Sequence, residues 1–308
     1  MTKRVLICLL IALSSLAMAA QCCPQKPASE KKSALWQKLQ EELRTADRQL
    51  DGVLGLAVKD LTSGEEFFIH PDEVMPQASS IKIAVLANLY LQAQRGKLKL
   101  SDEYIVRKED LVSGSDIMLG VTPGFTRLTL RDLATMMVAV SDNSATNVLI
   151  DRVGFDNVNA MLEGLGLHGT RLRRKMMDLK AASEGRENVS TPREMMTLLE
   201  TIHAGKLLNK EMTEDFIKVL STHKESSMLQ GLPDDAVAAN KPGELEAVRN
   251  DSGIVLIKGR PYILCVMTTY LKDEREGAAV IRKIAALTYS YFDRLARASE
   301  YGRVVSPK

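Results

Sequence analysis

Residues 75–89, MPQASSIKIAVLANL, mark the junction between the two parts of the predicted fold. A short loop gives way here to an apolar run, which predicts a buried helix from about Ile81. Ser79 and Lys82 lie three residues apart at the helix start, so they share one helical face and the amine is within reach of the serine oxygen. The free amides and the positive dipole end of a helix start favour an oxyanion. We therefore interpret Ser79 as a candidate nucleophile.

The Ser-x-x-Lys spacing alone is weak evidence, because two more such pairs occur, Ser29 with Lys32 and Ser221 with Lys224. A second candidate element is Ser141-Asp142-Asn143, which lies between two predicted helices. The Ser141 hydroxyl can relay a proton to a leaving nitrogen, and an asparagine amide can bind a substrate carbonyl. The alternative is that this segment only caps the second helix.

A third element, Lys241-Pro242-Gly243, follows on a predicted strand. A cation at Lys241 can bind a carboxylate and, as a like charge, favours the neutral form of Lys82 that a general base needs. Gly243 allows close approach of a ligand to the backbone, and the amide of Glu244 is a candidate oxyanion donor. The alternative is an ordinary solvated lysine in a turn.

The three elements, in this order and spacing, resemble the signature motifs of class A β-lactamases and penicillin-binding proteins. The resemblance covers roughly Ser33 to Ala298. It implies an acyl-transfer enzyme that attacks a cyclic amide such as a β-lactam through Ser79. It also implies roles for further residues: Lys82 and Ser141 move protons, Asn143, Lys241, Gly243 and Glu244 hold the substrate, and Arg249 is a second carboxylate anchor.

Two departures from that family matter. Pro242 stands where the family has a hydroxyl residue, which removes one donor to a substrate carboxylate. Met176 stands about where class A β-lactamases carry the glutamate that activates water, with Lys180 in place of a helpful asparagine. Asp178 is the nearest carboxylate and becomes the candidate base; the alternative is an ion pair with a neighbouring cation (Arg173, Arg174 or Lys175). We therefore expect intact acylation with slow deacylation, or a different base.

Periodicity along the chain predicts a mixed α/β (α+β) fold. A helix over 33–50 and a hairpin over 52–70 open it, and three strands (237–241, 252–258, 262–269) and a helix (274–298) close it. The helices expected between them cover 81–95, 130–140, 145–153, 158–165 and 192–204. We expect one catalytic domain, residues 33–308, with an antiparallel sheet lobe (33–75 and 236–308) flanked by helices and an inserted all-helical lobe (76–235).

The first 20 residues are typical of a secretory signal peptide. Lys3 and Arg4 precede an apolar run from Val5 to Leu16, and small residues follow at Ala17, Ala19 and Ala20. The run is too short for a membrane span. We therefore expect export to the periplasm or envelope, with residues 21–32 as a tether. Cys22 is a candidate site for a lipid anchor.

Composition excludes several other classes. Without the signal the chain carries 39 basic and 39 acidic residues, since Lys3 and Arg4 account for two of the 41 basic ones. This balance does not indicate nucleic-acid binding. The four histidines form no His-x-x-x-His pair, so we expect no metal and no cofactor. The expected partner is a small β-lactam or a D-Ala-D-Ala-type peptide, bound by a monomer. The alternatives are a D-alanyl-D-alanine peptidase and a non-catalytic envelope-binding protein.

Overall fold

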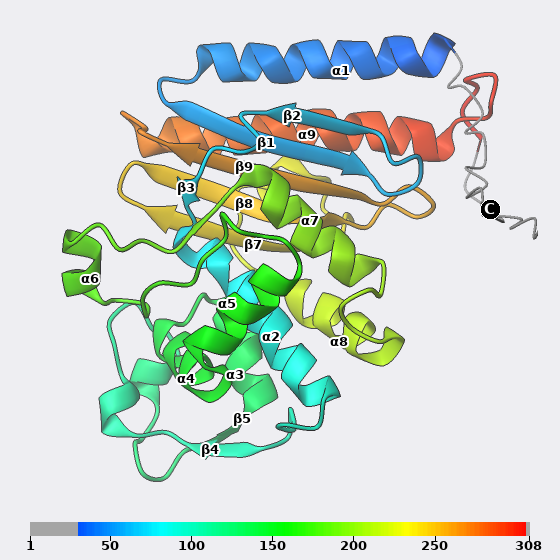
Figure 1. Cartoon of the computed structure of the whole chain (residues 1–308). Helices are drawn as coiled ribbons and strands as arrows, with labels where there is room; N and C mark the ends of the chain where they lie inside the picture. Colours follow the sequence, from blue (N-terminus) through cyan, green and yellow to red (C-terminus); the bar gives the residue numbers. More distant parts are fainter. Residues whose placement is uncertain (1–29, 306–308) are drawn as a thin grey trace, which may run out of the picture.

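A five-stranded antiparallel sheet built from both ends of the chain is the frame of the molecule (Figure 1). The computed structural model describes residues 30–305. The strand order is β2-β1-β9-β8-β7, so the first strands pair with the last ones. For example, Val53 lies opposite Thr269. The strands are β1 (Val53–Asp60), β2 (Glu66–Ile69), β7 (Ala238–Leu245), β8 (Val248–Val255) and β9 (Tyr262–Thr269).

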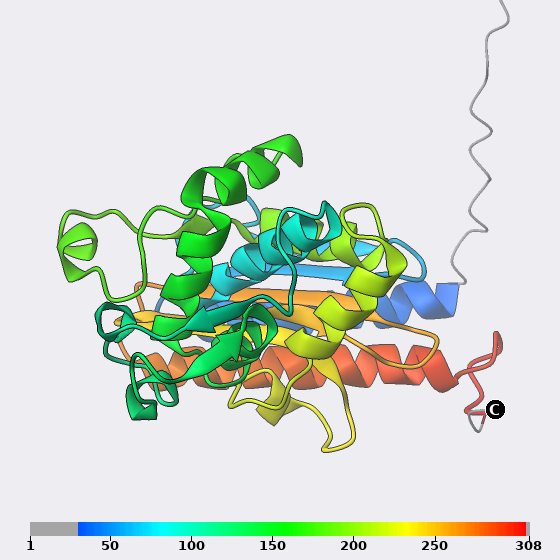
Figure 2. The ribbon, with the colours of Figure 1, turned by 90° about the horizontal axis from the view of Figure 1, so that it is seen from below.

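Two terminal helices, α1 (Glu30–Gln49) and α9 (Glu274–Arg297), pack together and complete one layer on the sheet. Their apolar stripes bury aromatic side chains against the strands, because a sheet face needs an apolar cover. Tyr262 of β9 stacks on Phe292 of α9 with 4.2 Å between ring centroids. Trp36 of α1 contacts the same aromatic cluster. Figure 2 shows α9 along one face of the sheet and helices from the middle of the chain along the other.

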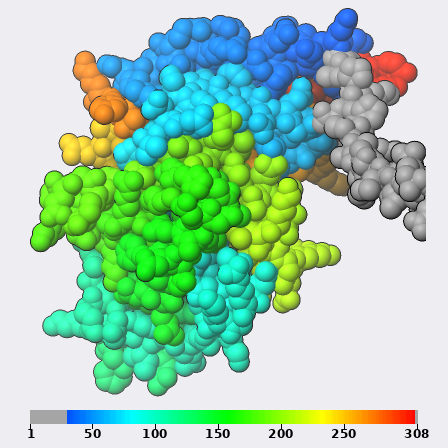
Figure 3. Space-filling view, in the orientation of Figure 1, coloured from blue at the N-terminus to red at the C-terminus, as the bar shows by residue number. Residues whose placement is uncertain are grey.

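The opposite face carries the inserted region. Its central helix, α2 (Lys82–Gln94), is preceded by a 3-10 turn, η1 (Ala78–Ile81), and is buried along nearly its whole length. The surrounding helices are α3 (Leu130–Ala139), α4 (Asn143–Val153), α5 (Phe155–Gly164), α6 (Leu179–Ser183), α7 (Pro192–His203) and α8 (Lys210–Leu220). α7 packs directly on β1, β8 and β9. In the space-filling view of Figure 3, the N-terminal part and the middle of the chain form two adjacent parts of the surface.

The predicted fold class is confirmed: an antiparallel sheet from both chain ends, flanking helices, and an inserted, mainly helical region. The inserted region also holds two short two-stranded sheets, β3 (Met75–Pro76) with β6 (Val189–Ser190) and β4 (Glu103–Ile105) with β5 (Arg127–Thr129). α6 and α8 were not among the predicted helices.

The structure describes only the last residues of the expected N-terminal tether. α1 begins at Glu30, so the last three residues of the expected tether are helical. The expected signal peptide, Cys22 and the rest of the tether lie outside the described residues. Within residues 30–305, no helix has the length and apolar character needed to cross a membrane.

Candidate active site

Ser79 lies in η1, directly under the middle of strand β7. A Cβ atom on Gly243 would lie 2.6 Å from Gln77 O, 2.8 Å from Ser80 N and 3.0 Å from Ser79 N. Only glycine therefore allows the strand to approach this turn. Ser79 itself is half-buried and shares a cavity wall with Glu244. The backbone amides of Ser79 and Glu244 are thus candidate oxyanion donors.

The three sequence elements meet at the side chain of Ser141. Lys82 Nζ, at the start of α2, donates to Ser141 O at 2.6 Å, to Ser141 Oγ at 2.9 Å and to Asn143 Oδ1 at 3.0 Å. Lys241 Nζ, from β7, donates to the same Ser141 Oγ at 3.1 Å. Ser141 has a φ of 56°, and such strained backbone is frequent at functional sites. Residues far apart in the sequence therefore converge on one hydroxyl.

Burial sets the protonation of the two lysines. The pKa of Lys82 is held well below its usual value, first by burial, which penalises the charged form, and second by the charge of Lys241. Burial also lowers the pKa of Lys241 to about 7, against the attraction of Asp251. The lowered pKa favours the neutral form of Lys82, which keeps two N–H donors and has the lone pair that a general base requires.

Two cavities meet at Ser79. The first, of about 620 Å³, we name the lysine cavity because Lys224 and Lys241 line it together with Ser79 and Ser141. The second, of about 580 Å³, we name the methionine cavity. Its apolar wall is formed by Met176, Met177, Leu179 and Tyr270. A ligand bound at Ser79 can therefore extend into a cationic space on one side and an apolar space on the other.

The loop over 170–188 borders the methionine cavity and is held in place by three asparagines. Asn147 bonds the backbone of Met176, Asn159 bonds that of Leu172, and Asn188 accepts hydrogen bonds from the amides of Arg173 and Arg174. Side-chain amides have both donor and acceptor groups, so each can satisfy loop backbone that forms no regular structure. These hydrogen bonds therefore hold the loop in one position.

The structure does not bring Asp178 to Ser79. Its exposed side chain caps α6 by accepting from Ala181 N at 2.9 Å, and it does not line either cavity. The alternative ion pair is also wrong for the described residues. Arg174 pairs with Glu187 and Lys175 pairs with Asp151.

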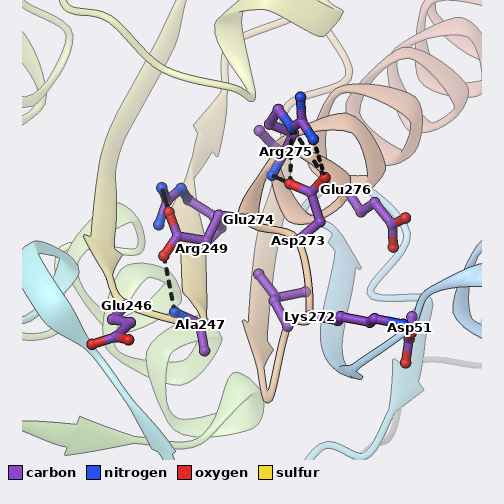
Figure 4. Close-up of a pocket in the computed structure, with 11 residues that line it drawn as sticks. Asp51, Glu246, Ala247, Arg249, Lys272, Asp273, Glu274, Arg275 and Glu276 are labelled. Atoms are coloured by element: carbon purple, nitrogen blue, oxygen red, sulfur yellow. Dashed lines mark hydrogen bonds and ion pairs between the residues drawn. The ribbon is translucent and has the colours of Figure 1, made fainter.

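Arg249 is likewise outside the two cavities at Ser79, and its Nε lies 3.8 Å from Oε2 of Glu244, which lines both of them. Its guanidinium lies 2.5 Å from Glu274 and also donates to the carbonyl oxygens of Leu245 and Val248. Figure 4 shows this pair in a separate open cavity of about 970 Å³ near the start of α9. Arg275 pairs with Asp273 in the same cavity. Arg249 therefore lines neither cavity at Ser79.

Sequence reasoning missed Lys224 and Tyr270. Lys224 follows α8 and its Ser-x-x-Lys spacing carries no information about the cavity it enters. Tyr270 has a φ of 54° and lies just after β9, where the chain turns at the rim of the methionine cavity. Both positions depend on how distant segments pack. Among the described residues, no group of histidine, cysteine and carboxylate side chains is arranged to hold a metal.

Comparison with known proteins shows the family. The sequence model of the beta-lactamase enzyme family matches residues 34–292, and the chain belongs to that family. Among curated relatives, beta-lactamase SME-1 of Serratia marcescens is 26% identical over 263 residues, which cover 82% of this chain and 88% of the relative. Beta-lactamase CTX-M-8 of Citrobacter amalonaticus is 26% identical over 253 residues, covering 80% and 86%.

Solved structures agree. The structure of PBP-A has a TM-score of 0.75 at 25% identity and covers 83% of this chain and 96% of that one. The beta-lactamase from Sphaerobacter thermophilus has a TM-score of 0.76 at 27% identity, with coverage of 84% and 98%. The chain is thus a serine hydrolase of the class A β-lactamase type.

Proposed function

We propose that Ser79 opens the amide of a β-lactam to form an acyl-enzyme that is released slowly. One observation carries this proposal: two buried lysines, Lys82 and Lys241, hydrogen-bond the same Ser141 oxygen beside Ser79. A hydroxyl between two amines can pass a proton in either direction. No carboxylate takes part in this group, so the proton transfers of acylation are assigned to the lysines and Ser141.

The acylation step follows from these positions. The neutral Lys82 amine takes the hydroxyl proton of Ser79 while the serine oxygen bonds to the carbonyl carbon. The amides of Ser79 and Glu244 stabilise the oxyanion. The carbon–nitrogen bond then breaks, Ser141 protonates the leaving nitrogen, and Lys82 returns a proton to Ser141. Asn143, through its contact with Lys82, orients the amine and borders the acyl group.

Deacylation lacks an evident base. Met176 is buried at the loop position where a water-activating carboxylate is expected, and a thioether cannot accept a proton. Glu187 lines the methionine cavity, but Arg174 holds it through two hydrogen bonds of 3.1 and 2.8 Å. Both bonds end on Glu187 Oε2, so Arg174 occupies that oxygen. Asp178 remains only as a base that a rearranged loop would bring in.

The second candidate is a D-alanyl-D-alanine peptidase or another penicillin-binding cell-wall enzyme. The absence of a carboxylate at Met176 favours it, since such enzymes share the nucleophile and lack the glutamate. One of the similar solved structures is an acyl-enzyme complex of a PBP-A variant with penicillin G. Turnover of a D-Ala-D-Ala peptide compared with that of a cephalosporin separates the two candidates. A non-catalytic envelope-binding protein is the third, and it predicts that Ser79→Ala leaves ligand binding unchanged.

The test is the lifetime of a covalent adduct. The purified mature chain is mixed with a penicillin and followed by intact mass, while a chromogenic cephalosporin reports turnover. We expect an adduct on wild-type protein that persists for many minutes, and none on Ser79→Ala. Rapid turnover without an adduct contradicts slow deacylation. A stable protein that forms no adduct and turns over nothing contradicts the enzyme.

Cellular context is part of the proposal. The signal-like first 20 residues support export to the periplasm or envelope, where a β-lactam-reactive enzyme meets its substrate. We propose cleavage after residue 20, a tether up to the start of α1, and a monomer. A lipid anchor at Cys22 is tested by the mass of the mature protein, because an acyl chain adds a mass that Cys22→Ala removes.

A further inference from the structure

The substrate carboxylate has lost two expected partners in this protein. Pro242 has no hydroxyl, and Arg249 is engaged by Glu274 and by two carbonyl oxygens. Lys241 alone remains of the predicted anchor, and its ammonium is already bonded to Ser141 Oγ and Pro242 O. If the proposed function holds, another donor has to complete the anion site.

Lys224 is a buried cation at that place. It lines the lysine cavity with Ser79, Ser141 and Lys241, although only 5% of its surface is exposed. Its ammonium donates one hydrogen bond, to Leu220 O at 2.9 Å, and takes part in no ion pair among the described residues. An ammonium has three N–H groups, so donors remain for a ligand.

The buried charged groups near the lysine cavity include two lysines and one carboxylate. Lys224 and Lys241 are both buried, and Asp251 is the buried carboxylate that attracts them. Asp251 already accepts from Ser226, Asn240 and the amide of Met228. The carboxylates that line the cavity are exposed, and water screens their charge: Asp116, Glu225 and Glu244. Two buried cations of this kind are stabilised by an anion that enters the cavity from solvent.

Without such an anion, the two buried ammonium groups of Lys224 and Lys241 repel each other, which destabilises their charged forms. Burial lowers the pKa of Lys224 to about 8, and its charge contributes to the lowered pKa of Lys241. Each lysine therefore makes protonation of the other harder. A carboxylate between them removes this repulsion and adds charge-assisted hydrogen bonds.

We propose that Lys224 is a substrate-binding residue that, together with Lys241, holds a carboxylate on the leaving-nitrogen side of the substrate. The side is fixed by Ser141, the proton donor to that nitrogen, which lines the same cavity. The acyl side then occupies the methionine cavity. Lys224 thereby selects substrates that carry an acidic group next to the scissile amide.

The experiment compares a penicillin with its uncharged methyl ester on wild-type protein and on Lys224→Met, which keeps the side-chain length without the charge. The measured quantity is the second-order rate constant of adduct formation on Ser79. For the acid we expect a loss of roughly 10- to 100-fold, the range of a hydrogen bond to a charged group. For the ester we expect almost no change, which also shows that the variant is folded.

Three further variants sharpen the result. Lys224→Arg keeps the cation and is expected to retain the preference for the acid. Lys218→Met removes an exposed lysine of α8 and is the matched control. Arg249→Met is expected to leave the acid-to-ester ratio unchanged. An equal loss for acid and ester in Lys224→Met, or a lost ratio in Arg249→Met, overturns the proposal. Wild-type protein that reacts with neither compound overturns the proposed function instead.

Discussion

The side-chain amide of Asn147 hydrogen-bonds both backbone polar groups of Met176. Met176 N donates to Asn147 Oδ1 at 2.8 Å, and Asn147 Nδ2 donates to Met176 O at 3.0 Å. Asn147 belongs to α4, so a rigid helix fixes the middle of the 170–188 loop. The position of residue 176 is therefore independent of its own side chain, which makes it a suitable site for substitution.

Met176→Glu is expected to shorten the life of the acyl-enzyme. The new carboxylate would enter the methionine cavity beside Ser79, where it can activate a water. General-base catalysis typically contributes about 10²- to 10⁴-fold, and a base that was not selected for its geometry should reach at least about tenfold. Adduct decay followed by intact mass measures the effect. Leu119→Glu, on an exposed residue that lines neither cavity at Ser79, is the control and should leave the decay unchanged.

Asn147→Ala and Asn159→Ala are expected to cost similar stability and to differ in function. Each substitution removes two hydrogen bonds to loop backbone, which corresponds to about 1 to 3 kcal/mol in the free energy of unfolding. Urea unfolding measures this loss. Of these two asparagines, Asn147 holds the part of the loop at the methionine cavity, so its variant should change the rate of adduct formation and the Asn159 variant should not. Equal kinetic effects would contradict a local role.

Gly243→Ala is expected to disable acylation. The added methyl group would overlap the backbone of Gln77, Ser80 and Ser79, and either η1 or β7 must shift. Removal of an oxyanion donor typically costs about 10²- to 10³-fold, so a loss of about 100-fold in the rate of adduct formation is expected. Gly120→Ala is the control, because a Cβ there has no neighbour within 4 Å. If Gly243→Ala retains the wild-type rate of adduct formation, the oxyanion is not held by the amides of Ser79 and Glu244.

The rate of acylation by an acidic β-lactam is expected to fall as the pH rises from neutral to alkaline. Lys241 and Lys224 hold a carboxylate only when protonated, and their pKa values are about 7 and about 8. The cations are therefore present below these values and are lost above them. Lys82 has the opposite requirement, since it acts as a neutral base, and its lowered pKa favours that form. Stopped-flow rates from about pH 6 to about pH 9 should show the decline for the acid and not for its methyl ester.

Local periodicity predicts most of the fold. The helix from Ile81, the hairpin before it and the C-terminal helix were predicted because their apolar residues recur at regular spacing. α8 follows the same rule, with Phe216, Val219 and Leu220 buried on one face, although it is absent from the predicted helices. The predicted strand stops at residue 241 because Pro242 and Gly243 have low strand propensity. In the structure, β7 continues for four more residues, because pairing with β8 overrides that low propensity.

The site was predictable where one motif determines it and not where packing does. The contacts of Lys82, Ser141 and Lys241 lie among residues that the three motifs contain. Asp178 begins a short helix, and a capping role follows from that local context. The pairing of Arg249 with Glu274 joins a strand to the start of α9. The sequence around one of these residues does not indicate the other as its partner. The position of Lys224 in the lysine cavity likewise depends on how distant segments pack.

The pairing of β1 with β9 has a consequence for biogenesis. The second strand of that pair is near the end of the chain, so the central sheet closes only after almost all of the polypeptide is available. Non-local pairing of this kind slows folding and leaves strand edges open until late. β7, which carries Lys241, is anchored through the same sheet, so a chain whose last strand is not yet paired has Ser79 without its cationic partner. The complete active site therefore forms only after the last strand is in place.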